Sequence, residues 1–391
     1  MHFVEVAIKV PLQRTFDYKV EQLLHSPELR VGMRVRVPFG SQKKIAVVLA
    51  IKTSTDVPED KIKAIIDVID DAPILSEQHL ALLKFTARYY CYPLGETIHT
   101  ALPAALRQGE CPDKTSINMV ELTDKGAKLP SLKAKTQLNL LKQLAQSGKS
   151  SLTELKALGF NKKTIDSLLE KELIKQFIEH DNQWQQRAPT IGSKPTLNKE
   201  QAVACTTINQ ASGFTCFLLE GVTGSGKTEV YLQCLEEVLK KGQQALVLVP
   251  EIGLTPQTVN RFRRRFPDTP IMLWHSALTD NERLQTWRFC EKGSCAIVIG
   301  TRSSIFLPFL SLGMIIVDEE HDSSFKQQDT LRYHARDLAA YRAYQQQIPL
   351  ILGSATPALE TLHKAINNKY QLLSLTERAQ TSTDNQFHLM D

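Results

Sequence analysis

The sequence predicts an α/β chain of three units: a β-rich N-terminal domain, a winged helix and a lobe with a parallel sheet. Three observations support this fold class. Alternating apolar residues, typical of half-buried strands, dominate the N-terminal part. Three short segments with helical periodicity, followed by a strand pattern, occupy the middle of the chain. The second half carries short, continuous apolar runs between helical segments, as in parallel sheets covered on both faces.

With 391 residues, of which 42% are hydrophobic and 23% charged, the chain has the composition of a packed, multidomain globular protein. Collagen-like, low-complexity and disulfide-stapled classes are excluded. The formal net charge of +5 has its basic excess in the N-terminal half, but it is too small to establish nucleic-acid binding. The seven cysteines are scattered without a Cys-x-x-Cys pair, which indicates reduced thiols and no zinc framework. No apolar run approaches the roughly 18 residues that cross a bilayer, so we expect a cytoplasmic protein without membrane contact.

Residues 1–108 form the predicted β-rich domain. Strand patterns at 3–10, 16–20, 33–39 and 44–52 are separated by turn residues. Ser76 is a candidate N-cap for a helix, and a second helical pattern at 94–106 is interrupted by Pro103. We therefore expect a β-sheet backed by helices.

Residues 109–180 form the predicted winged helix. A polar connection at 111–133 leaves room for one short strand, and helical patterns follow at 135–147, 151–158 and 161–171. The alternating segment 171–179 would close the unit as a hairpin. DNA contact by this unit and a role as a spacer or protein-contact module both stay open. Residues 181–197, which contain several Gln and Pro, are expected to be a linker.

Residues 198–391 form the predicted parallel-sheet lobe. Its strands are expected in the apolar runs 216–219, 245–249, 271–274, 296–299, 314–317 and 350–352. Helical segments such as 230–239 lie between these runs. This alternation is typical of α/β layer folds that bind nucleotides.

A phosphate-binding loop follows the first of these strands. Residues 221–228 read GVTGSGKT, which matches the pattern G-x-x-x-x-G-K-[ST] in its proper place between a strand and a helix. Backbone N–H groups of such a loop surround the phosphates, Lys227 would reach the β- and γ-phosphates, and the Thr228 hydroxyl would bind Mg²⁺. The sequence therefore predicts that ATP and Mg²⁺ are bound by Gly221, Val222, Thr223, Gly224, Ser225, Gly226, Lys227 and Thr228.

An acidic motif follows the apolar run at 314–317. Asp318 stands where phosphate-loop enzymes carry their magnesium-binding aspartate. Asp318 would hold the metal through water, and Glu319 would orient or deprotonate the attacking water. His321 completes the Asp-Glu-x-His pattern of helicase-type ATPases. A solvated strand end is the alternative interpretation, which the neighbouring phosphate loop weakens.

Over most of its length, through about residue 380, the chain resembles the PriA family of replication-restart helicases in superfamily 2. In the first part the resemblance rests on residues 11–18, 34–40, 101–103 and 106–109. In the second part it rests on residues 221–231, 249–257, 299–303, 318–324, 332–337 and 353–360. The resemblance implies a RecA-like lobe of an ATP-dependent 3′-to-5′ DNA helicase that recognises stalled forks and restarts replication by primosome assembly. The implied partners are branched and single-stranded DNA, primosome proteins and single-strand-binding protein.

The resemblance also implies roles for residues of the lobe. Gln201 resembles the family's adenine-side residue, with an ordinary capped helix start as the alternative. Residues 353–356 resemble the motif that couples hydrolysis to strand movement. The DNA backbone would be held by Thr255, Gln257, Thr301, Arg302 and Ser303. Residues 323–336 resemble an aromatic-rich loop that stacks on single-stranded DNA, with contacts from Phe325, Arg332, Tyr333 and Arg336 and with Leu331 where a Trp is expected.

In its first domain the family binds the 3′ end of a nascent strand. By resemblance, Phe16 would stack on the terminal base, and Asp17 would accept from the base edge or from the 3′-hydroxyl. Tyr18 and Lys63 would close the pocket. The alternative is that Phe16 and Tyr18 pack on opposite faces of a strand and that Asp17 is merely exposed.

The chain departs from the family in its C-terminal part. The second lobe with its arginine finger and the zinc-binding Cys clusters have no counterpart in the sequence. We therefore expect no zinc site, an unstructured tail at 380–391, and a fragment with little ATP turnover and no unwinding. Two other functions stay open: another superfamily 2 translocase, such as a fork-reversal helicase, and a non-catalytic module that holds a 3′ end and binds ATP without turnover.

Overall fold

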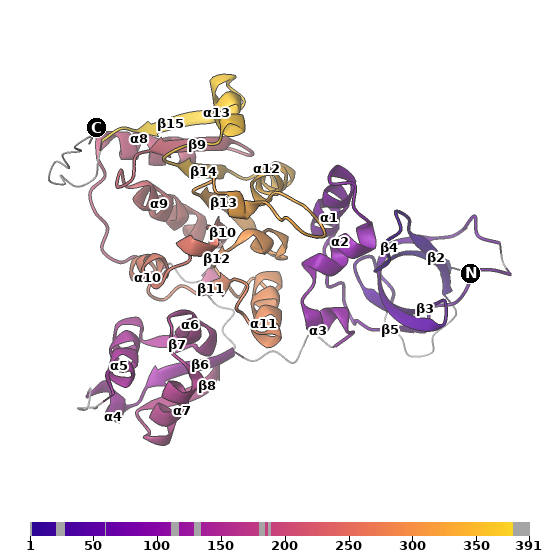
Figure 1. Cartoon of the computed structure of the whole chain (residues 1–391), viewed down its shortest axis with the longest axis horizontal. Helices are drawn as coiled ribbons and strands as arrows, with labels where there is room; N and C mark the ends of the chain where they lie inside the picture. Colours follow the sequence, from indigo (N-terminus) through magenta and orange to yellow (C-terminus); the bar gives the residue numbers. More distant parts are fainter. Residues whose placement is uncertain are drawn as a thin grey trace, which may run out of the picture.

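The computed structural model describes residues 2–20, 28–58, 60–110, 117–128, 134–179, 184–186 and 189–377. Figure 1 shows a curled N-terminal sheet at one end of the molecule, the large lobe at the other, and the winged-helix unit beside the lobe. The predicted unstructured tail at 380–391 lies outside the described residues.

The N-terminal sheet is antiparallel and has the strand order β2-β1-β4-β3-β5. Its strands are β1 (His2–Ile8), β2 (Phe16–Val20), β3 (Arg34–Phe39), β4 (Gln42–Lys52) and β5 (Asp67–Val68). The backbone N–H of Lys19 donates to Lys63 O at 2.9 Å, and that of Ile65 donates to Lys19 O at 3.1 Å. These bonds bring the two ends of the sheet together, so Lys63 lies beside β2.

Three helices join this sheet to the lobe: α1 (Glu77–Tyr89), α2 (Leu94–Ala101) and α3 (Ala104–Arg107). The Ser76 side chain accepts from the backbone N–H of His79 at 3.2 Å, which confirms the predicted N-cap. Helix α1 packs on α12 (Ala335–Gln346), where the Phe85 and Tyr341 rings stack with centroids 3.4 Å apart. One apolar core therefore runs from these helices into the lobe.

The winged-helix unit holds its helices against a three-stranded sheet of order β7-β6-β8. Its elements are β6 (Ile117–Leu122), α4 (Asp124–Ala127), α5 (Lys135–Ser147), β7 (Lys149–Ser151), α6 (Leu152–Ala157), α7 (Lys162–Glu170) and β8 (Ile174–Glu179). The predicted helices are confirmed, but the predicted hairpin is wrong. Strand β8 pairs with β6, which precedes all three helices, because β6 offers a full antiparallel register from Ile117 to Leu122.

The segment predicted as a linker is attached to the lobe. Trp184, in the short 3₁₀ turn Trp184–Gln186, is buried and donates its indole N–H to Gly293 O at 2.6 Å. A buried indole satisfied in this way resists displacement. This turn of the predicted linker is therefore packed on the lobe.

The lobe contains a seven-stranded sheet in which every pairing is parallel, with order β11-β12-β10-β13-β14-β9-β15. Its strands are β9 (Cys216–Gly221), β10 (Gln244–Leu248), β11 (Ile271–Trp274), β12 (Ile297–Gly300), β13 (Leu312–Asp318), β14 (Leu350–Ser354) and β15 (Gln371–Leu375). All predicted apolar runs are strands, and β15 is an additional edge strand. Its longer helices are α8 (Lys199–Asn209), α9 (Lys227–Lys240), α10 (Pro256–Arg265), α11 (Asp280–Glu291), α12 and α13 (Leu359–Ile366). Because the strands are parallel, their carboxyl ends share one edge, where ligands bind in such sheets.

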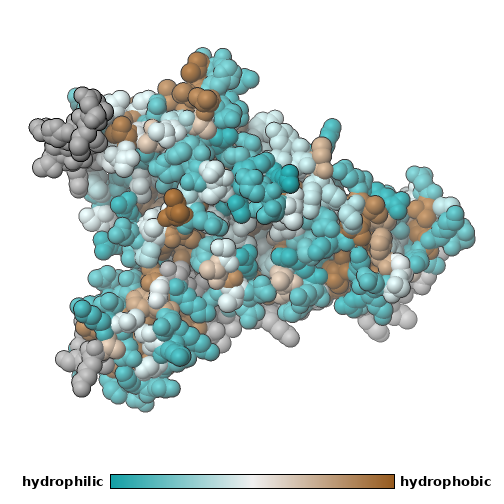
Figure 2. All heavy atoms as spheres, viewed as in Figure 1, coloured by the Kyte–Doolittle hydropathy of each residue, from teal (hydrophilic) through white to brown (hydrophobic). Residues whose placement is uncertain are grey.

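Most of the face shown in Figure 2 is hydrophilic. Apolar side chains gather where α13 and β15 lie in Figure 1, and the exposed ones are Leu359, Ile366 and Leu372. Among the helices that the structure describes, none combines the length and the apolar character needed to cross a membrane.

Candidate functional site

The phosphate loop connects β9 to α9, as the sequence predicts. Gly224 (φ 84°) and Gly226 (φ 86°) adopt left-handed backbone conformations that other residues rarely tolerate. The tip of the loop, at Val222 and Thr223, is exposed. The loop therefore faces solvent directly before the N-terminus of α9, where helix geometry favours anions.

Lys227 lies inside the loop rather than in solvent. Its side chain is buried, and its ammonium donates to Gly221 O at 2.7 Å. The same nitrogen lies 4.0 Å from the Glu319 carboxylate. The structure thus brings the phosphate loop and the acidic motif together, although 92 positions separate the two residues in the chain.

Asp318 ends β13 on the shared strand edge. Its Oδ1 accepts from the Tyr231 hydroxyl at 3.0 Å. Burial, followed by the charge of Glu319, raises the pKa of the Asp318 carboxyl above its usual value. A cation beside this group would relieve that penalty, and carboxylate and hydroxyl oxygens from Asp318 and Thr228 are donors that Mg²⁺ prefers. The residues present therefore fit a magnesium ion.

Glu319 and His321 lie beside Asp318 at the same edge. Glu319 has φ 48°, so the backbone turns sharply there, and its side chain is 40% exposed. His321 Nδ1 lies 2.7 Å from Ser354 Oγ and 3.7 Å from Glu319 Oε2. His321 thus joins the carboxyl ends of β13 and β14, and Glu319 keeps a carboxylate open to the loop.

Glu320 has a structural role that the sequence did not reveal. It is fully buried, and it accepts from Ala358 N at 2.7 Å, from the Thr361 hydroxyl at 2.8 Å and from the Arg336 guanidinium at 2.9 Å. Arg336, expected to contact DNA, is therefore engaged in a buried ion pair. The sequence gives no local signal for these contacts, since the partners come from distant segments.

The segment 323–336 does not present its rings to solvent. Phe325 and Leu331 are completely buried, and Tyr333 is buried edge-on against Phe306 with ring centroids 4.9 Å apart. The prediction that these rings stack on bases is therefore wrong for this conformation, because they fill the core instead. Arg332 is exposed and stays a candidate DNA contact.

The remaining predicted DNA contacts of the lobe form two groups. Arg302 donates to Ser324 O at 3.1 Å and so stabilises the segment 323–336. Thr301 is buried, and Ser303 accepts from the Trp274 indole at 2.9 Å. By contrast, Thr255 caps α10 and, with Gln257, is exposed. These exposed residues fit a backbone contact better than the buried ones do.

Gln201 is the N3 residue of a capping box at the start of α8. Its side-chain oxygen accepts from Asn198 N at 3.0 Å, and its amide N–H donates to Ser225 O at 2.8 Å. The capped helix start that the sequence left as an alternative is thus present. Through Ser225, Gln201 also supports the phosphate loop, and its contact with the base stays a prediction.

The predicted 3′-end residues come together on β2. Phe16 and Tyr18 share one face of the strand, where the Phe16 ring lies edge-on to Phe39 at 5.2 Å and the Tyr18 hydroxyl donates to Pro38 O at 2.9 Å. The alternative with opposite faces is wrong, since residues two apart in a strand point the same way. Asp17 is not merely exposed: it accepts from Lys52 at 3.1 Å and from the Thr55 hydroxyl at 2.6 Å.

Comparison with known proteins agrees with this architecture. Residues 5–103 match the 3′ DNA-binding domain (3′BD) of PriA, and residues 198–365 match the DEAD/DEAH box helicase family. The replication restart protein PriA of Haemophilus influenzae is 46% identical over 98% of this chain and 53% of its own length. The chain belongs to the PriA family.

Other PriA proteins match the chain with lower identity. Those of Bacillus subtilis and Chlamydia trachomatis are 34% and 35% identical over 97% and 100% of the chain, and over 56% and 53% of their own lengths. The chain thus spans about half the length of these PriA relatives. The two regions that match family models include the β2 residues and the phosphate loop, respectively.

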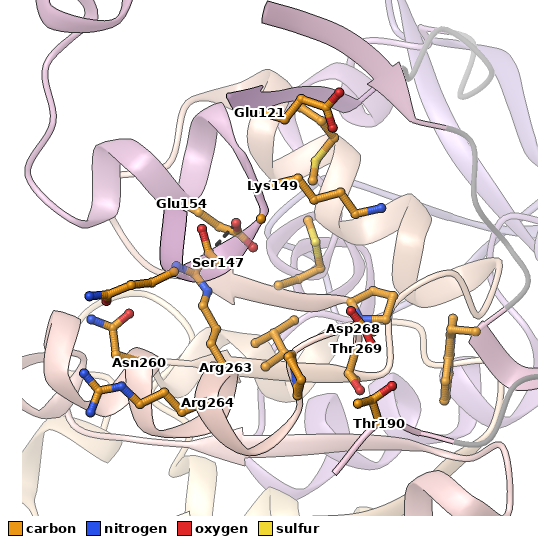
Figure 3. A pocket seen from close by; sticks show the side chains of 18 of the residues that line it. Glu121, Ser147, Lys149, Glu154, Thr190, Asn260, Arg263, Arg264, Asp268 and Thr269 are labelled. Carbon is orange, nitrogen blue, oxygen red and sulfur yellow. Dashed lines mark ion pairs between the residues drawn. The ribbon is translucent and has the colours of Figure 1, made fainter. Parts of the chain in front are cut away.

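A separate cavity in this PriA-family chain lies between the winged-helix unit and the lobe (Figure 3). It has a volume of about 980 Å³ and is lined by side chains of both charges, among them Lys149, Glu154, Arg263, Arg264 and Asp268. Glu154 and Arg263 form an ion pair across it at 3.1 Å. No residue of the phosphate loop lines this cavity, so it is distinct from the nucleotide site.

Proposed function

We propose that the chain forms the nucleotide-binding and DNA-end-binding part of an ATP-dependent 3′-to-5′ DNA helicase that restarts stalled replication forks. The observation that carries this proposal is the approach of Lys227 to the acidic motif, with its ammonium 4.0 Å from Glu319 beside the exposed phosphate loop. Family membership supports it, since the relatives carry the name replication restart protein.

The geometry suggests how the residues act on ATP. The Lys227 ammonium would exchange Gly221 O for phosphate oxygens, and the loop N–H groups would bind the rest of the phosphate chain. Bound Mg²⁺, held by Thr228 and Asp318, would neutralise charge on the phosphates. Glu319 would orient or deprotonate the attacking water. Through its contact with Ser354, His321 would transmit structural changes at the nucleotide site to the segment that follows β14.

The N-terminal domain would bind the 3′ end of a DNA strand, as the matched domain family is named. Phe16 is half-buried, with the Arg14 guanidinium 5.1 Å from its ring centroid, and Lys63 is exposed close to β2. A base could stack on the ring while the cations meet phosphates. Asp17, held by Lys52 and Thr55, would shape the pocket for an uncharged 3′-hydroxyl.

Partners beyond DNA follow from the family alone. Primosome proteins and single-strand-binding protein are proposed partners, and DNA contact by the winged-helix unit is a further proposal. Two alternative functions can be distinguished by experiment. A non-catalytic module would bind ATP without hydrolysing it, whereas a helicase hydrolyses ATP. Another superfamily 2 translocase would not need the β2 pocket for a 3′ end.

The first experiment tests the nucleotide site. Equilibrium titration of the chain with a fluorescent ATP analogue and Mg²⁺ should show binding that Lys227→Ala abolishes. Lys240→Ala is the matched control, because Lys240 lies on the same helix with an exposed ion pair to Glu237. Equal binding by the Lys227 variant and the parent would contradict the proposed ATP site.

The second experiment tests the DNA end. Forks with a 3′-hydroxyl should bind more tightly than forks with a 3′-phosphate, and Phe16→Ala and Asp17→Ala should each reduce this preference. A stacked base contributes about 1–3 kcal/mol. Ile51→Ala, an exposed change on the neighbouring sheet surface, is the control. Indifference of the parent to the 3′ group would exclude the β2 pocket and leave the ATP site untouched.

A further inference from the structure

One buried hydroxyl, on the helix that follows the phosphate loop, reaches two strands of the nucleotide site. Tyr231 lies on α9, one helical turn after Lys227, and is 1% exposed. Its hydroxyl donates to Asp318 Oδ1 at 3.0 Å. The same hydroxyl packs against Gly353 of β14, where an added Cβ would overlap it. The phosphate-loop helix, the end of β13 and the strand that leads to Ser354 therefore meet at this oxygen.

The contact with Asp318 restricts how that carboxylate can turn. A buried phenol needs an acceptor, and a charged acceptor gives a stronger hydrogen bond than a neutral one. With Oδ1 held by Tyr231, rotation about the Asp318 side chain would break this bond. The bond therefore fixes the direction of the second carboxylate oxygen.

Gly353 leaves the space that the Tyr231 hydroxyl occupies. Strand β14 lies between β13 and β9, and Gly353 is in register with both Asp318 and Leu219. Because glycine has no side chain, the phenol of Tyr231 can reach across β14 to β13. Any larger residue at position 353 would occupy the space that the hydroxyl now fills.

We propose that Tyr231 is a positioning residue for magnesium: its hydroxyl holds the Asp318 carboxylate in the orientation that binds the metal of the metal–nucleotide complex. The inference rests on the proposed function, because it requires a nucleotide in the phosphate loop. Partners of this kind, which touch a metal ligand and not the metal, typically contribute 10–100-fold to metal affinity.

The test separates metal binding from nucleotide binding in the intact chain. A fluorescent, non-hydrolysable ATP analogue is titrated first in EDTA and then at increasing Mg²⁺ concentrations. For Tyr231→Phe we expect nucleotide affinity in EDTA like that of the parent, and about a tenfold higher Mg²⁺ concentration for half-maximal enhancement of binding.

A second tyrosine, which is half-buried, provides a control for the loss of a phenol hydroxyl. Tyr370→Phe removes a hydroxyl that lies 3.2 Å from Lys364 Nζ, and it should leave both titrations like those of the parent. Tyr231→Met, also without a hydroxyl, provides the same comparison if the Phe variant does not fold.

Two results would overturn the inference. One is an unchanged Mg²⁺ requirement in the folded Tyr231 variant, and the other is an equal loss of affinity with and without Mg²⁺, which indicates a packing role alone. Failure of the proposed ATP site gives a different result, because the parent chain itself would then not bind the analogue.

Discussion

The carboxyl end of β13 separates two regions that differ in what their side chains can reach. On the nucleotide side, Glu319 is partly exposed and faces the open phosphate loop. On the other side, in residues 320–336, Glu320 and Phe325 are completely buried. Consecutive residues of one motif thus serve a ligand site and the core, because the backbone turns at Glu319. A sequence motif therefore predicts where a site lies, but it does not predict which residues of the motif face the ligand.

The largest expected effect comes from the buried region. Phe325→Ala should lower the free energy of unfolding by about 3–5 kcal/mol, the usual cost of removing a core aromatic ring. Chemical denaturation would measure this loss. Nucleotide affinity of the folded variant should be unchanged. A small loss of stability together with weaker single-stranded DNA binding would instead show that the ring is available to bases.

The adjacent carboxylates provide the sharpest comparison. Glu320→Gln should destabilise the fold by about 3 kcal/mol, since it leaves Arg336 buried without its counter-charge. Glu319→Gln should change stability by no more than about 0.5 kcal/mol, yet it should suppress residual ATP hydrolysis. Denaturation curves and phosphate release distinguish the two variants. Equal stabilities would remove the distinction between the two regions.

The buried region extends to the contact between α1 and α12, where His79 provides a pH prediction. Burial, and then the nearby Arg342 charge, lowers the pKa of His79 from 6.5 to about 3. The folded state therefore binds fewer protons than the unfolded state below pH 6.5, so stability falls as pH drops from 6.5 towards 3.

The expected loss from His79 is about 2 kcal/mol at pH 5. It would be measured as the difference between urea unfolding at pH 7 and at pH 5. His79→Leu should flatten this dependence, whereas His363→Leu, on an exposed part of α13, is the control. A parent-like pH dependence in His79→Leu would assign the loss to other groups.

The smallest effect is expected at Arg332, an exposed cation in the segment whose aromatic rings are buried. Arg332→Ala should weaken single-stranded DNA binding modestly. It should also reduce the slope of log affinity against log salt concentration by about one, the value for one phosphate contact. Stability should not change. Binding measured across salt concentrations checks this, and Lys240→Ala is again the control. An unchanged salt dependence would show that Arg332 does not contact a DNA phosphate.

Local sequence determined much of what could be predicted. The phosphate loop is contiguous, so its residues, its strand and its helix follow from a short stretch. The apolar runs of the central strands were equally clear, whereas β15 escaped prediction because this edge strand has polar residues at Gln371 and Ser374 and no continuous run of buried apolar residues. Ser76 and the helix it caps were also correctly predicted.

What could not be predicted depends on partners distant in the chain. The residues next to Glu320 in the sequence do not indicate its hydrogen bond with Thr361. The residues next to β8 do not indicate that this strand pairs with β6 rather than with a hairpin partner. Tyr231 carried a weak signal, since it lies four residues after Lys227 on the same helix face. Whether an aromatic residue such as Phe325 stacks on DNA or fills the core depends on tertiary packing that composition does not encode.

The place of β14 in the sheet also limits how this site could change in evolution. Neighbouring strands lie about 4.8 Å apart, so the ends of β9 and β13 are about 9.6 Å apart with β14 between them. At that separation, the phosphate loop after β9 and Asp318 at the end of β13 could contact the same metal–phosphate group. A topology with one more strand between them would widen the gap to about 14 Å, and Lys227 and Asp318 could then no longer act on the same phosphate. Insertions in this lobe are therefore expected in the loops and at the outer strands, while the run from β13 through β14 to β9 stays intact.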